Sequence, residues 1–190
     1  MTRFLTPSAS ALRPGLALAI ALWGLLGSPE SAATVSIRVL LLRGVPFAEV
    51  SSRGRLRVYS LGEARLLHET DGESPVGLRA QGGRLILSDR GERPLPAGGV
   101  RLRAVEESIR LNGAAYRGAI DAAASREGLR VVNVVRLEDY LRGVVGREVP
   151  ARWPQAALQA QAVAARTFAL LLRGRAERAA SGPAFSHLTA

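Results

Sequence analysis

The sequence contains no cysteine and no lysine, only one methionine and two histidines, and 5% aromatic residues in 190 positions. Without cysteine, disulfides cannot stabilise the fold, which must depend on its hydrophobic core. His68 and His187 are far apart in sequence, so neither a metal site nor another cofactor is expected. A hydrophobic content of 47% is typical of a globular protein and excludes wholesale disorder.

All 26 basic residues are arginines, and the formal net charge is +10. A bias towards arginine is typical of a GC-rich genome. The positive charge nevertheless indicates an acidic partner, and the candidates are nucleic acid, anionic lipid and an acidic polysaccharide.

The first 33 residues have the pattern of a secretory signal peptide. Arg3 and Arg13 precede an apolar stretch at 15–27, and the small residues of 31–33 follow it. Thirteen apolar residues are too few for a membrane span, which needs about 20. We therefore expect export to the periplasm or cell wall, with a membrane contact only through an uncleaved signal segment. Export argues against a nucleic-acid partner.

Residues 34–135 consist of short apolar runs separated by glycine, a pattern that predicts β-strands. Asn112-Gly113 predicts a hairpin turn. The proline-containing loop at 89–99 is expected to separate two β subregions. The predicted strands are 35–42, 56–60, 83–88, 100–104, 108–111, 116–123 and 129–135.

From Leu137 onwards the sequence predicts helices. A short helix is expected at 137–146, because Glu138 and Asp139 suit a helix N-terminus. A linker at 147–154 leads to a long alanine-rich helix from Pro154 to about Glu177. That helix is apolar on nearly all sides, which predicts burial. The expected fold class is α+β: a β-rich N-terminal half, then a short helix and a long buried helix.

Three polar residues in this region are candidate site residues. Gln161 and Arg166 lie among apolar positions of the long helix, where a polar group needs a partner. Both could belong to a structural network, for example with Arg166 paired to Glu148, or Arg166 could lie on a solvated face. Glu148 is expected on a stiff, non-helical link before Pro150, near Val149 and Trp153. A carboxylate held there could act as a general acid, although an exposed linker glutamate is the commoner case.

The continuous string from Leu137 to Leu170, LEDYLRGVVGREVPARWPQAALQAQAVAARTFAL, resembles the signature of the SpoIID/LytB family of bacterial envelope proteins. That signature is L-E-x-Y-L-x-G-V-V, then E-M-P, then W-P-x-E-A-L-x-A-Q-A-V-A-A-R-T-Y-A. Val149 replaces the usual methionine and Phe168 the usual tyrosine. The resemblance implies a SpoIID/LytB-like domain at 34–190, with a β-rich subregion at 34–104 and a catalytic core at 105–190.

The resemblance also implies a function. SpoIID members are lytic transglycosylases that cleave peptidoglycan glycan strands stripped of stem peptides, and LytB members enhance an amidase. The glutamate of E-M-P, the catalytic acid, falls on Glu148, and the arginine of A-A-R-T falls on Arg166. Gln161, Arg147 and Arg152 are further substrate-binding candidates. The alternative is a non-catalytic wall-binding modulator of a peptidoglycan amidase.

The family domain continues past the long helix into a region of polar motifs, in some members with zinc-binding Cys and His. The resemblance therefore implies that this chain lacks the C-terminal part of the domain.

Overall fold

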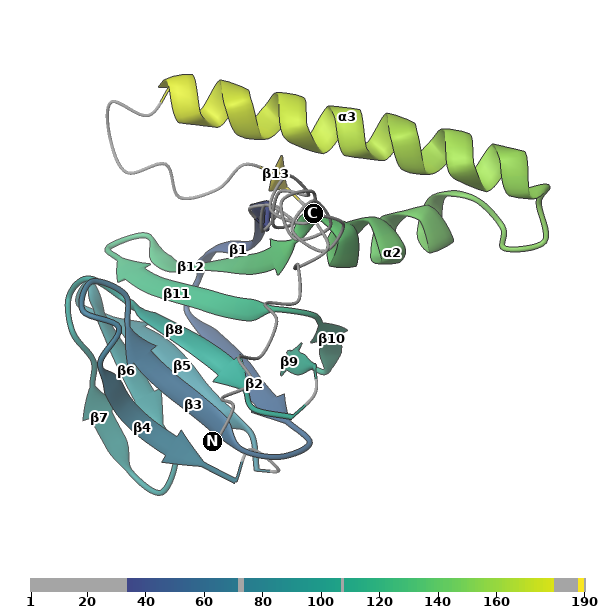
Figure 1. Ribbon diagram of the computed structural model, residues 1–190. Coiled ribbons are helices and arrows are strands. Elements are labelled where there is room, and N and C mark those ends of the chain that lie inside the picture. Colours follow the sequence, from purple (N-terminus) through teal and green to yellow (C-terminus); the bar gives the residue numbers. More distant parts are fainter. Residues whose placement is uncertain (1–33, 72–73, 107, 180–187, 190) are drawn as a thin grey trace, which may run out of the picture. The chain divides into compact units, whose positions relative to one another are not determined.

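The structure is a computed structural model, which describes residues 34–71, 74–106, 108–179 and 188–189. The predicted signal peptide lies outside the described residues. Thr34–Ala190 forms one compact unit. In this unit two β-sheets face each other, and the helices α2 (Leu137–Glu148) and α3 (Gln155–Ala179) follow the last long strand (Figure 1). The expected α+β fold class is confirmed.

The first sheet has seven strands in the order β13-β1-β12-β11-β8-β3-β4. Its strand pairs are antiparallel, except for the parallel pair of β1 and β13. In chain order its strands are β1 (Ser36–Val45), β3 (Leu56–Ser60), β4 (Leu66–Thr70), β8 (Val100–Ala104), β11 (Ala119–Ser125), β12 (Gly128–Arg136) and β13 (Leu188–Thr189).

The second sheet has six antiparallel strands in the order β10-β9-β2-β5-β6-β7. Strands from both sides of residue 104 share each sheet, because β8 pairs with β11 and β2 pairs with β9. In chain order its strands are β2 (Phe47–Ser52), β5 (Val76–Gln81), β6 (Arg84–Ser88), β7 (Glu92–Pro94), β9 (Ile109–Leu111) and β10 (Ala114–Tyr116).

The main core fills the space between the sheets. Alternate residues of β3, β6 and β9 point into it, as expected for a sheet with one face on a core. Its fully buried members include Leu56, Val58, Leu102, Ile120 and Val131 from the first sheet, and Ala48, Val50, Val76, Leu78 and Ile109 from the second. Burial of these aliphatic side chains supplies most of the driving force for folding.

Two predicted strands, 56–60 and 100–104, have the same bounds as β3 and β8, and four others are confirmed with shifted ends. The predicted strand at 116–123 is in fact two, because the chain turns between β10 and β11. Gly118 makes that turn with φ +84, and a Cβ there would overlap the carbonyl oxygen of Val134. The hairpin at Asn112-Gly113 is confirmed, with both residues at positive φ (47° and 82°) between β9 and β10.

The sequence prediction missed β2, β4, β5, β7 and β13. β7 lies inside the predicted loop at 89–99, where it pairs with β6. β5 contains Gly77, which has no side chain of its own to bury. The ring of Phe47 on the neighbouring strand covers Gly77, and a Cβ there would lie 2.9 Å from the ring carbon Cε2. The burial of β5 at Gly77 therefore depends on Phe47, a residue distant in sequence, so the local sequence pattern does not indicate this strand.

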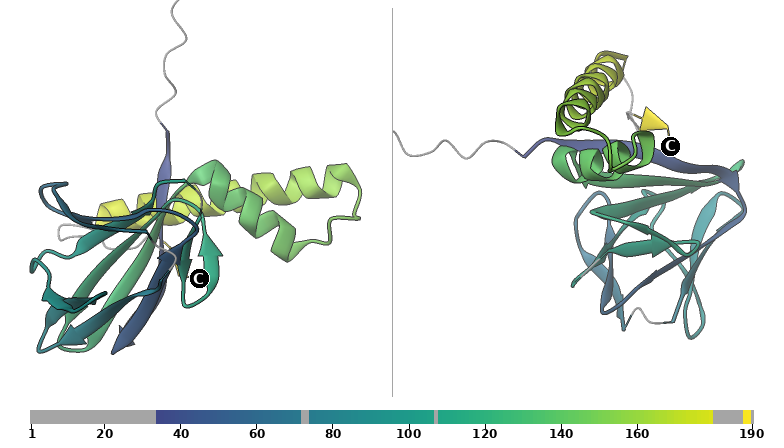
Figure 2. Two further views of the ribbon diagram at one scale, coloured as in Figure 1. Left: turned by 90° about the horizontal axis from the view of Figure 1, so that it is seen from below. Right: turned by 90° about the vertical axis from the view of Figure 1, so that its right-hand side faces the viewer.

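The helices pack on the first sheet at β1 and β12 (Figure 2). A second, smaller core joins them to these strands through buried apolar side chains. These are Ile37, Val39, Val135, Leu137, Leu141 and Ala169. Within the described residues, no helix is both long and apolar enough to cross a membrane.

Candidate active site on the helical hairpin

Helix α2 begins directly where β12 ends, so the sheet fixes its position. Arg136 is the extended N-cap residue, and the amide of Leu137 donates a hydrogen bond of 2.9 Å to the carbonyl of Val35. Leu137 and Leu141 are buried one turn apart and hold the helix on the sheet. The rest of α2 extends beyond the strands and carries the candidate site.

Glu148 is the last residue of α2, so its predicted place on a non-helical link is wrong. The residue directly before Pro150 is Val149, and this residue is extended, with φ −129 and ψ 139. Proline restricts only its immediate predecessor, so the helix continues through Glu148 and ends at Val149. Helix α3 begins one residue after Pro154, whose carbonyl accepts a 2.9 Å hydrogen bond from the amide of Ala157.

The predicted burial of the long helix is also wrong for the described structure. Ala169 is fully buried, whereas Val163 is 60% exposed, Phe168 58% and Leu171 45%. Only one face of α3 packs against α2 and β1, through Ala165, Ala169 and Leu172. An apolar composition favours burial only where another element covers each face, and no described element covers the outer faces.

The hairpin of α2 and α3 brings Gln161 to Glu148. The side-chain amide of Gln161 donates a hydrogen bond to Oε2 of Glu148, although thirteen residues separate them in sequence. Glu148 is exposed and Gln161 is half-buried. The amide therefore holds one carboxylate oxygen in place while the side chain of Glu148 stays accessible to a substrate.

Tyr140 lies near the same carboxylate. Burial raises the pKa of the Tyr140 phenol, and the negative charge of Glu148 raises it further. Sequence reasoning did not select Tyr140 as a site residue. The signal was nevertheless present, because Tyr140 is the tyrosine of the L-E-x-Y-L start of the motif.

Arg166 binds Glu138 rather than Glu148. Its Nη2 lies 2.7 Å from Oε2 of Glu138, and its Nε lies 3.3 Å from Oε1, a bidentate pair between α3 and α2. The side chains are 41% and 60% exposed, so this pair is a surface contact. Glu138 thus lies in the first turn of α2, as expected, and also fixes the guanidinium of Arg166. The neighbouring acidic residue, Asp139, pairs with Arg142 on its own helix at 3.0 Å.

The other two candidates are not brought into contact with this group. Arg147 and Arg152 are both exposed, Arg147 in the last turn of α2 and Arg152 in the turn before α3. The structure thus joins Glu148 with Gln161 by a hydrogen bond, with Tyr140 within electrostatic range of the carboxylate. The pair of Arg166 and Glu138 lies further along the same hairpin. Among the described residues, no cluster of His, Cys, Asp and Glu side chains could hold a metal ion.

Comparisons with known proteins find similarity in this part of the chain. Residues 125–189, from the end of β11 to β13, match the family model described as SpoIID: Stage II sporulation protein. The chain is also 42% identical over 65 residues to a protein of Brachyspira hyodysenteriae (strain ATCC 49526 / WA1) described as uncharacterized. That alignment covers 34% of this chain and 18% of the relative, so the chain spans under a fifth of the relative's length. No solved structure matches the chain.

Proposed function

We infer from the SpoIID-family segment at residues 125–189 that this protein has a role at the bacterial cell wall. We propose specifically that it is exported and cleaves peptidoglycan glycan strands as a lytic transglycosylase, with Glu148 as the catalytic residue. Export rests on the predicted signal peptide at 1–33. The substrate class and the reaction rest on the motif and on the side chains gathered around Glu148.

One observation carries the proposal: an exposed carboxylate receives a single fixed hydrogen bond from a neighbouring helix. Gln161 holds Oε2 of Glu148, and the structure gives no described partner for Oε1. Acid–base catalysis requires a carboxyl group that is both oriented and within reach of the substrate. An unconstrained surface glutamate would meet only the second requirement.

A lytic transglycosylase needs only one such group. Hydrolytic glycosidases use two carboxyl groups, one as the acid and the other as base or nucleophile. Here Glu148 would give its proton to the glycosidic oxygen as the bond to the muramic C1 breaks. The resulting carboxylate would take the proton of the muramic C6 hydroxyl, whose oxygen bonds to C1 and forms a 1,6-anhydro ring. The proton lost in the first step is regained in the second, and no water is consumed.

The positive charge of the hairpin suits this substrate. A glycan strand without stem peptides exposes the lactyl carboxylate of each muramic residue. Arg147 and Arg152 are exposed on either side of Glu148 in sequence, and Arg166 lies five residues beyond Gln161, about 7.5 Å along the helix axis. We propose that these arginines bind lactyl carboxylates, as guanidinium groups form paired hydrogen bonds with carboxylates.

The test compares wild type with Glu148→Gln, which keeps the shape of the side chain and accepts the Gln161 contact but cannot transfer a proton. Both proteins are incubated with peptide-free glycan strands, and anhydro-ended products are counted by mass spectrometry. Glu63→Gln, a change at an exposed turn between β3 and β4, is the matched control. We expect release by wild type and the control and a loss of at least about a hundredfold in Glu148→Gln. Equal release by all three proteins would refute the assignment of Glu148.

A second function is favoured by the exposed apolar side of α3. Val163, Phe168 and Leu171 form a surface typical of a contact with another protein. A non-catalytic modulator would use such a surface to bind a peptidoglycan amidase. In that case Val163→Asp would abolish stimulation of the amidase, whereas Glu148→Gln would leave it unchanged. Amidase stimulation that is absent or unaffected by Val163→Asp, together with loss of anhydro-product release in Glu148→Gln, would favour the transglycosylase.

A further inference from the structure

The outer face of the first sheet carries a second concentration of arginines, separate from the helical hairpin. Strand register places them on one side, because residues directly opposite each other on paired strands point to the same face. Asp121 on β11 is opposite Arg101 on β8, and Ala119, two residues away, is opposite Arg103. We call this surface the arginine face; its basic residues are Arg38 and Arg43 (β1), Arg57 (β3), Arg101 and Arg103 (β8) and Arg130 (β12).

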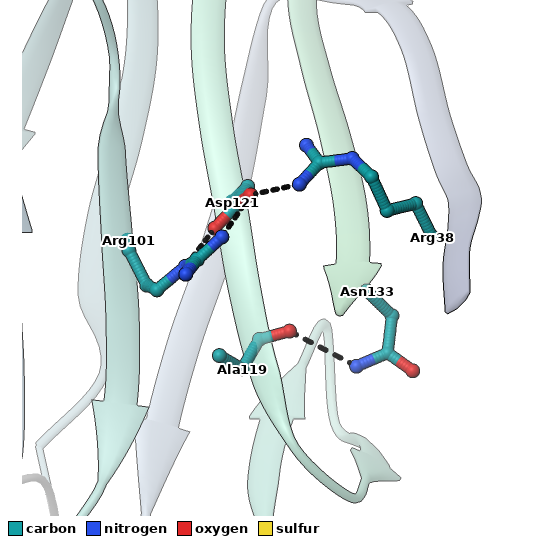
Figure 3. A network of polar contacts seen from close by, with 5 residues as sticks. All are labelled: Arg38, Arg101, Ala119, Asp121 and Asn133. Carbon is teal, nitrogen blue, oxygen red and sulfur yellow. Dashed lines mark hydrogen bonds and ion pairs between the residues drawn. The ribbon is translucent and has the colours of Figure 1, made fainter. Parts of the chain in front are cut away.

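Two carboxylates neutralise part of this charge. Asp121 is only 1% exposed and binds Arg101 through contacts of 2.6 and 2.9 Å (Figure 3). It also binds Nη1 of Arg38 at 2.9 Å, so one buried carboxylate joins β1, β11 and β8. Glu69 on β4 pairs with Arg57 at the other end of the face. Arg43 and Arg103 are exposed and have no ion pair in the part of the chain that the structure describes.

Several arginines of this face lie directly opposite one another. Arg43 is directly opposite Arg130, and Arg103 is directly opposite Arg57. Burial lowers the pKa of Arg130, and the like charges of Arg43 and Arg38 lower it further. Like charges opposite each other on paired strands destabilise a sheet. An anion bound at the face would reduce the repulsion between these neighbouring guanidinium groups.

Two hollows occur along the arginine face. One, of about 610 Å³, is lined by three arginines, Arg43, Arg126 and Arg130, by one carboxylate, Glu127, and by mostly small residues. The other, of about 240 Å³, is lined by Arg101 and Arg103 with Tyr59. The face extends over five adjacent strands from β1 to β3, or about 19 Å at the usual strand spacing. It is thus long enough for an extended polymer.

We propose that the arginine face binds a linear polysaccharide carrying a carboxylate on its repeating unit. The fork of a guanidinium group matches a carboxylate in shape and charge, and arginines repeated across strands match charges repeated along a chain. A membrane surface would require inserted apolar side chains, and Leu66 at the edge strand is the sole large exposed apolar residue of this face among those described. Single-stranded nucleic acid would require several stacking aromatic rings, and the described part of the face has one, Tyr59.

The polymer at the arginine face would be the same class of glycan that we propose for Glu148, and to that extent the inference rests on the proposed function. The two surfaces differ in their elements, since one lies on sheet strands and the other on α2 and α3. The arginine face would thus hold a strand on the protein while the hairpin acts on it. Its binding can be measured with a polysaccharide that Glu148 does not cleave.

The test measures binding of fluorescently labelled polygalacturonate oligomers by anisotropy at several salt concentrations. The variant Arg43→Gln/Arg103→Gln removes two exposed arginines for which no ion pair is found in the described structure. Arg84→Gln/Arg90→Gln removes the same charge from exposed positions outside the arginine face. We expect about tenfold weaker binding for the first variant, less than about twofold for the second, and loss of affinity with salt. Melting curves of all three proteins exclude unfolding as the cause.

Equal weakening by both double variants would overturn the proposal, because it would mean that net charge alone attracts the polymer. Tighter binding of a single-stranded oligonucleotide or of phosphatidylglycerol vesicles at the same ionic strength would overturn the assignment to a polysaccharide. Failure of the proposed cleavage would be a separate result. In that case Glu148→Gln would release as much anhydro product as wild type. The Arg43→Gln/Arg103→Gln variant would still bind polygalacturonate more weakly than wild type, and the arginine-face proposal would stand.

Discussion

Gln161 on α3 donates a hydrogen bond to the carboxylate of Glu148 at the end of α2. This contact joins two conspicuous polar residues of the motif across a turn of six residues, 149–154. It explains why a glutamine lies among the apolar positions of the long helix: its amide has a charged acceptor on the neighbouring helix. The contact also orients the carboxylate that we propose to act on the glycan.

Removing this hydrogen bond is expected to impair the proposed reaction more than the fold. In Gln161→Ala, Glu148 stays exposed but loses its fixed orientation, and we expect release of anhydro products to fall about 10- to 100-fold. The measurement is the initial rate of product release at saturating and at low glycan concentration. Gln159→Ala, at an exposed position of the same helix, is the control. An unchanged rate in Gln161→Ala would contradict the positioning role.

Arg166 and Glu138 form an exposed bidentate pair, so we expect only a small contribution to stability. A double-mutant cycle of Arg166→Ala and Glu138→Ala, measured by urea unfolding, should give a coupling free energy of about 1 kcal/mol or less. If Arg166 binds substrate carboxylates, Arg166→Lys should raise KM for the glycan while the unfolding midpoint stays the same. A coupling of several kcal/mol would instead assign the pair a mainly structural role.

The buried carboxylate of Asp121 is expected to be essential for stability. In Asp121→Ala, Arg38 and Arg101 lose their shared counter-ion within the sheet, and we expect a loss of about 3–5 kcal/mol in the free energy of unfolding. Replacing two partners together, as in Asp121→Leu/Arg101→Met, should cost less, because fewer charges remain uncompensated. Urea denaturation followed by circular dichroism measures both. A loss under about 1 kcal/mol in Asp121→Ala would show that water compensates the arginines.

Tyr140 gives a pH dependence whose sign follows from its raised pKa. Because burial and the charge of Glu148 raise the pKa in the folded protein, the unfolded chain loses the phenolic proton first as pH rises. The contribution of the neutral Tyr140 phenol to the free energy of unfolding is therefore fully present below about pH 10. It is lost as the pH rises through the pKa of Tyr140 in the folded protein. Urea unfolding between neutral pH and that range measures this loss.

Glu148→Gln removes one of the two causes of this shift, so the pKa of Tyr140 should move back towards its ordinary value. Absorbance titration of the phenol, with Tyr140→Phe to identify its signal among the three tyrosines, detects the change. A pKa of Tyr140 equal in wild type and Glu148→Gln would place the carboxylate too far from the ring to contribute to the site.

Much of the local structure follows from the sequence alone. The alternation in residues 36–40 indicates β1, the pair Asn112-Gly113 indicates a hairpin, and the alanine-rich run beginning near Gln155 indicates a long helix. These features depend on residues close together in the chain, where backbone preferences and side-chain spacing act directly. The motif from Leu137 to Leu170 likewise identifies Glu148, Gln161 and Arg166 as candidates, because it is a continuous string.

Other features depend on contacts between distant residues, and only the tertiary structure decides them. The partner of Arg166 is Glu138 rather than Glu148, because the two helices run antiparallel from a short turn. The arginine face exists because cross-strand register brings β1, β12, β11, β8 and β3 side by side. The sequence determines which side chains are present and which segments of the backbone are helical or extended. The packing of sheet and helices determines which charges meet, since hydrogen bonds and ion pairs act only at short range.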